Sequence, residues 1–269
     1  MTTVLGRLLA ALPLVLALGG CAAAASTASV TRQDTVVLGV KADQPGLAER
    51  ASGGYRGFEV DFGTEVARRI GAKRVEYRTV TSEDRERLLN GHRVDLVLAS
   101  YSITPERAAQ VTFGGPYTTA HQRIMVRAGE RGVGGVRDLA GRRLCEASGS
   151  VSTARIVQGL GIRPTLVPAA SYSDCYAKLR SGEVDAVSTG DLVLAGFARR
   201  GGVRLVGDAF TDEPYGVGMR KGDLDGCEAV NKAITVMYQD GTAGRLLHRW
   251  FEGAGLRPVA EVPEFHGCS

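Results

Sequence analysis

Short apolar runs alternate with amphipathic segments along most of this chain. The run from Val94 to Ala99 is continuous, which is typical of a strand buried on both faces. Phe62, Val66 and Ile70 recur every fourth residue, and this spacing predicts an amphipathic helix that ends at Gly71. Two further apolar runs predict strands at 35–40 and 75–80. The order strand, helix, strand, helix, strand predicts a parallel sheet covered by helices.

A second helix is predicted just ahead of the Val94 strand. Ser82 is expected to be its N-cap, with Glu83 and Asp84 in the first turn and Gly91 closing the helix. Arg85 would then lie three residues after the cap, at a helix end that already favours anions.

A glycine-rich break at 129–135 marks the start of a second series of strands and helices. We expect strands at 123–127, 142–145, 165–168, 184–188, 203–206 and 215–220, and helices from about 151 to 159, at 171–180, from 191, at 223–239 and at 242–251. The last strand would return to the first lobe. Two similar α/β lobes joined by two crossings predict a hinged clamp with an interlobe cleft and mostly parallel sheets.

The N-terminus has the pattern of an export signal. Arg7 precedes an apolar core, Leu8 to Leu18, which is too short to span a bilayer because spanning takes about 20 residues. The following Gly-Gly-Cys resembles a lipobox that would leave Cys21 as a lipidated first residue; the alternative is an ordinary secretory signal with an incidental cysteine.

The expected division of the chain is a signal peptide at 1–20, a flexible tether at 21–34, lobe 1 at 35–126, lobe 2 at 127–213, a return to lobe 1 at 214–252 and a C-terminal tail at 253–269.

Export changes how the other cysteines are interpreted. Cys145, Cys175, Cys227 and Cys268 form an even set, and an oxidising compartment predicts two disulfides among them. Three pairings are possible, and the order along the chain favours Cys145–Cys175 with Cys227–Cys268. No CxxC pair occurs, so a zinc site is not expected.

Hydroxyls and one cation follow the Val94 strand. Ser100, Ser102 and Thr104 come first, and Arg107 follows them. Ligands of open α/β sheets bind at the carboxyl ends of strands, and an arginine fork can grip a carboxylate with two hydrogen bonds. These residues therefore suit a small carboxylate, although alone they also fit a Ser/Thr turn with a surface arginine.

The sequence contains few signals of nucleic-acid binding, catalysis, or cofactor or metal binding. A net charge of +4, spread among carboxylates without a basic run, gives no indication of nucleic-acid binding. The chain contains no phosphate loop, no GxSxG and no HExxH, and its histidines are scattered. We therefore expect no cofactor and no metal.

Several stretches together resemble the family 3 extracellular solute-binding proteins of amino-acid ABC importers, and in particular the glutamate-binding lipoproteins of actinobacteria. The resemblance covers about residues 35–252 and rests on the stretches GVKADQPGL (39–47), GFEVD (57–61), ASYSITPER (99–107), FGGPY (113–117) and VDAV (184–187). It implies the type II periplasmic-binding-protein fold, no enzymatic activity, and lipidation at Cys21. Cys145 and Cys175 also recur in that subgroup.

The resemblance also implies roles for individual residues. Arg107 should hold the ligand α-carboxylate, helped by Ser102 and by a carbonyl near Ser100, and Asp191 should hold the α-ammonium. The turn at 149–152, which includes Ser150 and Val151, should offer backbone amides to carboxylates at a helix N-terminus.

Selectivity for an acidic side chain is expected from Lys41, Ser82 and Arg85, which match basic and serine positions of relatives that bind acidic amino acids. A neutral glutamine would leave a buried cation unpaired. Two departures stand out. Val151 replaces a usual threonine, and Gly190 precedes Asp191 where another aspartate is common.

The expected function follows from this resemblance. The protein should be a monomeric lipoprotein on the outer face of the cell membrane that captures glutamate or aspartate and delivers it to ABC permease subunits. A glutamine-binding protein, an amino-acid sensor that signals to a membrane partner, and a dehydratase of cyclic acids on the same fold are the alternatives.

Overall fold

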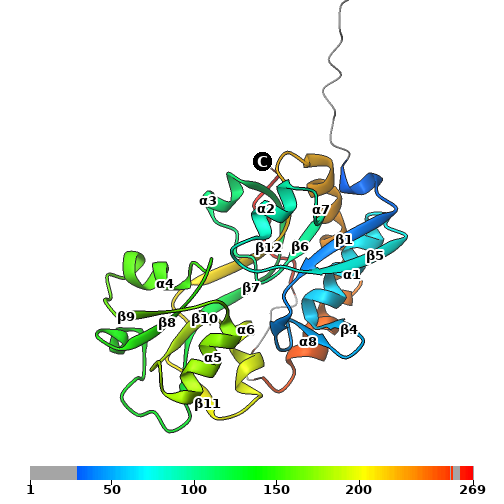
Figure 1. The fold of residues 1–269 in the computed structure, drawn as a ribbon. Coiled ribbons are helices and arrows are strands. Elements are labelled where there is room, and N and C mark those ends of the chain that lie inside the picture. Colours follow the sequence, from blue (N-terminus) through cyan, green and yellow to red (C-terminus); the bar gives the residue numbers. More distant parts are fainter. Residues whose placement is uncertain (1–28, 255, 257–260, 269) are drawn as a thin grey trace, which may run out of the picture.

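The computed structural model describes residues 29–254, 256 and 261–268, which form two α/β lobes (Figure 1). Two long neighbouring strands, β7 (Val111–Arg127) and β12 (Asp212–Arg220), run from one lobe into the other. The two lobes therefore share one continuous sheet, and the cleft lies to one side of these strands.

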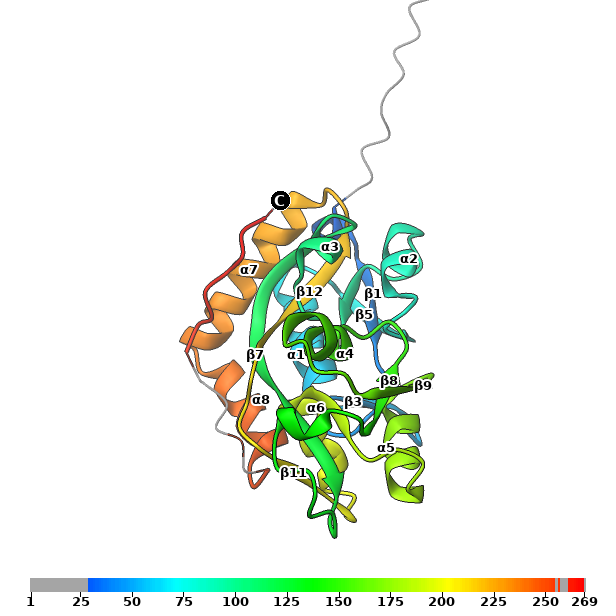
Figure 2. The same ribbon diagram turned by 90° about the vertical axis from the view of Figure 1, so that its left-hand side faces the viewer.

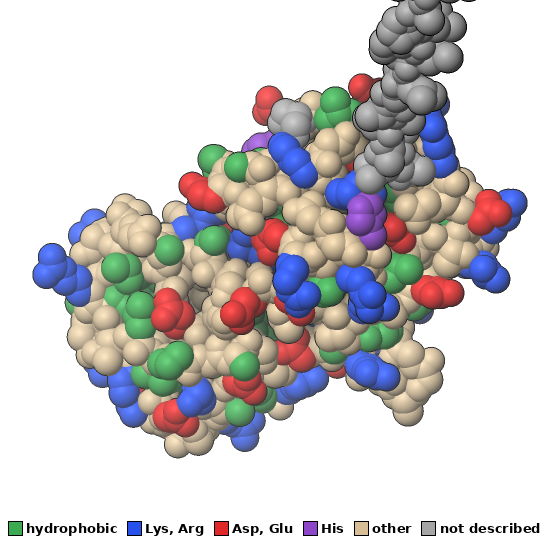
Figure 3. All heavy atoms as spheres, turned by 45° about the horizontal axis from the view of Figure 1, so that its top comes forward, with side chains coloured by type: hydrophobic (Ala, Val, Ile, Leu, Met, Phe, Trp, Pro, Cys, Tyr) green, Lys and Arg blue, Asp and Glu red, His purple; other side chains and the backbone are tan. Residues whose placement is uncertain are grey.

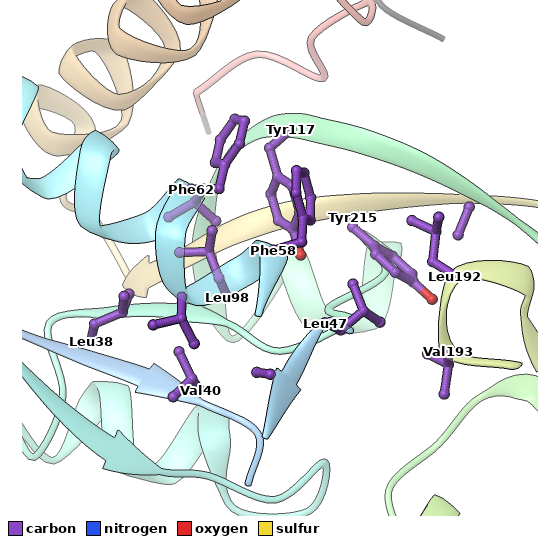
Figure 4. Close-up of a cluster of buried hydrophobic side chains, with 14 of the residues drawn as sticks. Leu38, Val40, Leu47, Phe58, Phe62, Leu98, Tyr117, Leu192, Val193 and Tyr215 are labelled. Carbon is purple, nitrogen blue, oxygen red and sulfur yellow. The ribbon is translucent and has the colours of Figure 1, made fainter. Parts of the chain in front are cut away.

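Lobe 1 carries the N-terminal elements and the last two helices (Figures 1 and 2). Its elements are η1 (Val30–Arg32), β1 (Thr35–Val40), β2 (Asp43–Gln44), β3 (Ala48–Ala51), β4 (Gly54–Arg56), α1 (Phe58–Arg69), β5 (Arg74–Thr79), α2 (Arg85–Asn90), β6 (Leu96–Leu98), α3 (Pro105–Ala108), α7 (Leu224–Gln239) and α8 (Thr242–Phe251). Aromatic rings of α1, β7 and α8 pack together in its core, with Phe58 5.4 Å from Phe62 and 5.6 Å from Phe251 between ring centroids (Figure 4). Burying each such ring stabilises the fold by about 1.5–3 kcal/mol.

Lobe 2 is smaller and carries the remaining elements. These are η2 (Val136–Leu139), β8 (Arg143–Ala147), α4 (Ser152–Ala154), the π-helical turn η3 (Arg155–Gly159), β9 (Thr165–Ala169), α5 (Tyr172–Ser181), β10 (Val187–Gly190), α6 (Asp191–Ala198) and β11 (Val203–Val206). The disulfide between Cys145 and Cys175 joins β8 to α5, with 5.6 Å between the Cα atoms.

The central sheet has the order β10-β7-β12-β6-β1-β5, and β11 also pairs with β7. The pairs β1–β5, β1–β6 and β8–β9 are parallel, as the helix-covered units of each lobe predict. The two long strands pair antiparallel with each other and with β6, β10 and β11. The expectation of mostly parallel sheets thus holds within the βαβ units and not for the strands that connect the lobes.

The strand β7 is much longer than the predicted segment 123–127. It begins at Val111 and includes the Phe113 to Tyr117 stretch, whose glycines and proline are poor strand signals. The Gly115–Pro116 bond is cis. Phe113 and Gly114 pair with β12, and the pairing resumes at Thr118 after a register shift, so the strand continues past the proline in spite of its composition.

Two other local predictions are wrong. Ser82 is not the N-cap of α2: Asp84 occupies that position, and its backbone N–H and carboxylate exchange hydrogen bonds with Thr81. The last residues of the tether expected at 21–34 belong to the folded domain instead, because Val30 is buried and its N–H donates to Asp223 at 2.9 Å. The predicted signal peptide and Cys21 lie outside the described residues.

The C-terminal segment 261–268 lies against lobe 1. Cys268 bonds to Cys227 of α7, and the His266 N–H donates to the Gly115 carbonyl at 3.2 Å. Both predicted disulfide pairings are therefore confirmed. None of the described helices is long and apolar enough to cross a membrane.

Candidate functional site

Arg107 is held at the cleft by the short helix that follows β6. Thr104 caps α3 by accepting from the Arg107 N–H at 3.3 Å, and Pro105 fixes the first helical position. The Arg107 guanidinium then turns back and donates from Nη1 to the Ser102 carbonyl at 2.9 Å. Its side chain is buried, and this burial, followed by the neighbouring charge of Arg85, lowers its pKa to about 10. It therefore remains a cation at neutral pH.

Arg85 is the first residue of α2 and only 1% exposed. Its guanidinium carbon lies 3.8 Å from the centroid of the Tyr101 ring, and Nη1 donates to the Ala99 carbonyl at 3.3 Å. The Nε atom has no hydrogen-bond partner within the described part of the chain. The Glu86 carboxylate lies 3.5 Å from this Nε and 3.9 Å from that of Arg107, so it partly balances both cations.

Lys41 and Ser82 lie beside Arg85. Lys41, at the end of β1, is 6% exposed and donates from Nζ to the Ser82 hydroxyl at 2.8 Å. Burial, and then the positive charge of Arg85, lowers the pKa of Lys41 to about 7. The structure thus brings the three predicted selectivity residues together.

Glu59 supports this side of the cleft, and sequence reasoning assigned it no role. Its Oε1 accepts from the Ser100 N–H and from the Tyr117 hydroxyl, both at 2.6 Å. Burial raises its pKa, although these two hydrogen bonds act in the opposite direction. Ser100 has a left-handed backbone (φ 44°), so this contact holds an unfavourable turn in place. The GFEVD stretch at 57–61, which contains Glu59, is the sequence signal from which a role for this residue could have been predicted.

The opposite wall of the cleft is the turn at 149–152 of lobe 2. The Gly149 carbonyl accepts from Arg107 Nη2 at 3.1 Å, and the Ser148 hydroxyl donates to Glu83 at 2.8 Å. Ser150 bonds to the Tyr172 hydroxyl at 2.6 Å. Lobes 1 and 2 therefore touch directly across the cleft.

An inner cavity of about 20 Å³ lies between these walls. Seven predicted residues are among its lining: Ser82, Arg85, Ser100, Ser102, Arg107, Ser150 and Val151. Lys41 lines an adjoining cavity of about 130 Å³ that shares Ser82 and Tyr172 with the first. An open outer groove of about 1150 Å³, between α2, α3 and the start of η3, leads to Arg107 and Ser150. The inner cavity holds about one water molecule, so a larger ligand requires the lobes to separate first.

Asp191 is the predicted site residue that does not line these cavities. Its Oδ1 accepts from the backbone N–H of His121 at 3.0 Å and from that of Leu192 at 2.8 Å, and its Oδ2 lies 3.5 Å from the His121 ring. The carboxylate thus bonds to the first turn of its own helix and fastens α6 to β7. This placement does not support the expected role in binding an ammonium group.

Glu213 lines the inner cavity and was missed by the sequence analysis. It is the second residue of β12, it is 3% exposed, and it pairs with Arg155 at 2.6 Å. The sequence offered only a weak signal for it, since Asp212 and Glu213 are two adjacent carboxylates just ahead of the strand predicted at 215–220.

Charges of both signs are interspersed on the face shown in Figure 3, over both lobes. The concentration of cations is therefore a property of the cleft and not of this surface.

The model of the bacterial extracellular solute-binding proteins, family 3, matches residues 36–253. The chain belongs to this family. Its members are solute-binding proteins rather than enzymes, and the two-lobed type II fold agrees with this assignment.

Relatives of this solute-binding protein differ in the ligands that their names give. The chain is 37% identical to the glutamate-binding protein GluB of Corynebacterium glutamicum, over 79% of this chain and 77% of GluB. It is 29% identical to the glutamine-binding protein GlnH of Bacillus subtilis, over 84% of each chain. A solved structure of an ancestral arginine-binding protein bound to glutamine superposes with a TM-score of 0.75 at 31% identity, covering 81% of this chain and 98% of that one.

Proposed function

We propose that this solute-binding protein captures glutamate or aspartate between its lobes and delivers it to an ABC importer. It would act at the outer face of the cell membrane, held there by a lipid on Cys21. The class of protein follows from the family, whereas the ligand and the anchor are our proposal.

One observation carries the choice of ligand: Lys41, Arg85 and Arg107 are all buried around one cleft. Burying a cation is costly unless an anion pairs with it. Glu86 balances the two arginines only in part. A ligand with two carboxylates would balance the rest, with the α-carboxylate on Arg107 and the side-chain carboxylate near Arg85 and Lys41. The Arg107 fork has five N–H groups, of which two already bond to carbonyls, and the rest are available to a carboxylate.

The geometry also favours an acid over its amide. Glutamine has the shape of glutamate but would place a neutral amide next to Arg85 and Lys41. Leaving a buried charge without its partner costs about 3–5 kcal/mol, which corresponds to a hundredfold or more in affinity. Because one relative is named for glutamate and another for glutamine, the affinities for these two ligands are the most informative pair to compare.

Calorimetric titration of residues 29–269 with a panel of amino acids tests the proposal. We expect glutamate or aspartate to bind at least about a hundredfold more tightly than glutamine, and at least tenfold more tightly than arginine or cystine. Tighter binding of glutamine would refute the acidic specificity, and failure of every α-amino acid to bind would refute the receptor function.

The anchor is tested separately in cells. The Cys21→Ser variant of the full chain should appear in the medium or in the soluble fraction, while the wild-type protein sediments with membranes. Equal membrane association of the two would contradict lipidation at Cys21.

A further inference from the structure

The inner cavity is lined by an acidic residue as well as by two arginines. Among the described residues that line this cavity, Glu213 is the one acidic residue, and Arg85 and Arg107 line the same space. The negative charge of Glu213 acts on Arg107, since it opposes the lowering of the Arg107 pKa by burial. The cavity thus has a positive and a negative pole, as a zwitterion requires.

Contacts with Arg155 and Thr211 hold Glu213 in place. Arg155 lies 2.6 Å from Oε1 through its Nε and donates to Oε2 from Nη2 at 3.2 Å, while the Thr211 hydroxyl donates to Oε1 at 3.1 Å. A carboxylate offers about four acceptor sites, so these three contacts orient the group and leave one site on Oε2 for a further donor. Arg155 is therefore a positioning residue for Glu213.

The neighbouring corner between β10 and α6 supplies no alternative acid. Gly190 has no side chain, and a Cβ built on it would lie 2.2 Å from the Tyr215 hydroxyl, so the Tyr215 ring occupies the space that a side chain there would need. Asp191 uses its Oδ1 for two backbone N–H groups and its Oδ2 faces the His121 ring. In Figure 4, Tyr215 extends from β12 toward Leu192 of α6, which closes this corner.

We propose that Glu213, at the start of the connecting strand β12, binds the α-ammonium group of the ligand while Arg107 binds its α-carboxylate. This assignment rests on the proposed function and replaces Asp191 in that role. It makes the strand that joins the lobes part of the ligand site, so one ligand would contact lobe 1, lobe 2 and the connection between them.

The test compares L-glutamate with glutarate, which has the same two carboxylates and no ammonium group. Isothermal titration of the wild-type protein should show a preference for glutamate of about 30-fold or more, the effect of a charged hydrogen bond. In Glu213→Gln this preference should fall to within about threefold, because glutamate loses affinity and glutarate does not.

Asp191→Asn is the matched control, since its amide oxygen can still accept from His121, and it should keep the wild-type preference. If Glu213→Gln fails to fold because it leaves the half-buried Arg155 without its partner, the double variant Arg155→Gln with Glu213→Gln removes both charges and should show the same loss of preference.

Three results would overturn the assignment. The preference could survive in Glu213→Gln, or it could vanish in Asp191→Asn. The wild-type protein could also bind glutarate as tightly as glutamate, which would leave the receptor function intact. Failure of the wild-type protein to bind any amino acid would reject the proposed function and this assignment together.

Discussion

Arg107 of lobe 1 donates a hydrogen bond from Nη2 to the carbonyl of Gly149 in lobe 2, at 3.1 Å. The residue proposed to hold the ligand carboxylate thus also holds the lobes together. Gly149 itself has a left-handed backbone (φ 69°), and a Cβ there would lie 2.5 Å from the Ser82 carbonyl carbon. The contact between the lobes therefore requires glycine at this position.

Replacing Gly149 by alanine should hinder closure of the cleft. The added Cβ would push against the Ser82 backbone, so we expect glutamate affinity to fall by about tenfold or more, together with a loss of about 1–2 kcal/mol of stability from backbone strain. Titration calorimetry and chemical unfolding measure the two effects. Gly161→Ala is the control, because Gly161 has the same φ of 68° and nothing within 4 Å of its Cβ position. It should lose stability without losing affinity, and equal loss of affinity in both variants would contradict the role of closure.

Arg85 should set the preference for an acidic side chain. In Arg85→Gln we expect the glutamate-to-glutamine affinity ratio to fall by about tenfold or more, because the buried charge that rejects the amide is gone. Arg87→Gln on the same helix, where the side chain is exposed, should leave the ratio unchanged. Parallel titrations with glutamate and glutamine measure this ratio. An unaltered ratio in Arg85→Gln would show that other residues determine the selectivity.

Binding of an acidic ligand should be linked to uptake of a proton by Lys41. Its pKa is about 7 without ligand, and a nearby carboxylate would raise that pKa because it favours the charged form. Near pH 8 the complex would then bind more protons than the free protein, so affinity should be full below pH 7 and decline as the pH rises above it. Calorimetry in buffers of different ionisation enthalpy measures the uptake directly. Lys41→Gln should abolish it, and release of protons by the wild-type protein would contradict the prediction.

The disulfide between Cys145 and Cys175 should stabilise lobe 2. It closes a loop with a sequence separation of 30, and the chain-entropy model assigns about 3–4 kcal/mol to such a crosslink. The double variant Cys145→Ala with Cys175→Ala should lose a stability of this order in chemical unfolding. A loss below about 1 kcal/mol would show that native packing alone holds β8 against α5.

Local periodicity predicted most of the elements that surround the cleft. The strand at Thr35–Val40 and the helix at Thr242–Phe251 have the predicted bounds, and the Val94 run forms β6. These segments bury a regular apolar face, so their pattern is visible in the sequence. The long strand β7 is longer than predicted because Gly114, Gly115 and Pro116 are poor strand signals, whereas pairing with β12 on both sides of Gly115 and Pro116 makes the whole segment a strand.

The positions of some side chains in the site could be predicted and those of others could not. Arg85 and Lys41 were expected in the cleft from the resemblance, and both are there, although α2 begins later than expected and is capped by Asp84 and not by Ser82. Asp191 and Glu213 could not be distinguished in the same way. The Asp191 carboxylate is held by the His121 backbone N–H, 70 residues away in sequence, and the Tyr215 ring fills the space beside Gly190, so neither effect is visible in the local pattern.

Titration of wild-type protein and of Arg107→Ala with L-glutamate tests the central claim most directly. We expect saturable one-to-one binding to the wild-type protein and a loss of at least a hundredfold in the variant, since the remaining site would leave a buried carboxylate without its cation. Folded Arg107→Ala protein that binds glutamate within about tenfold of the wild type would contradict the account.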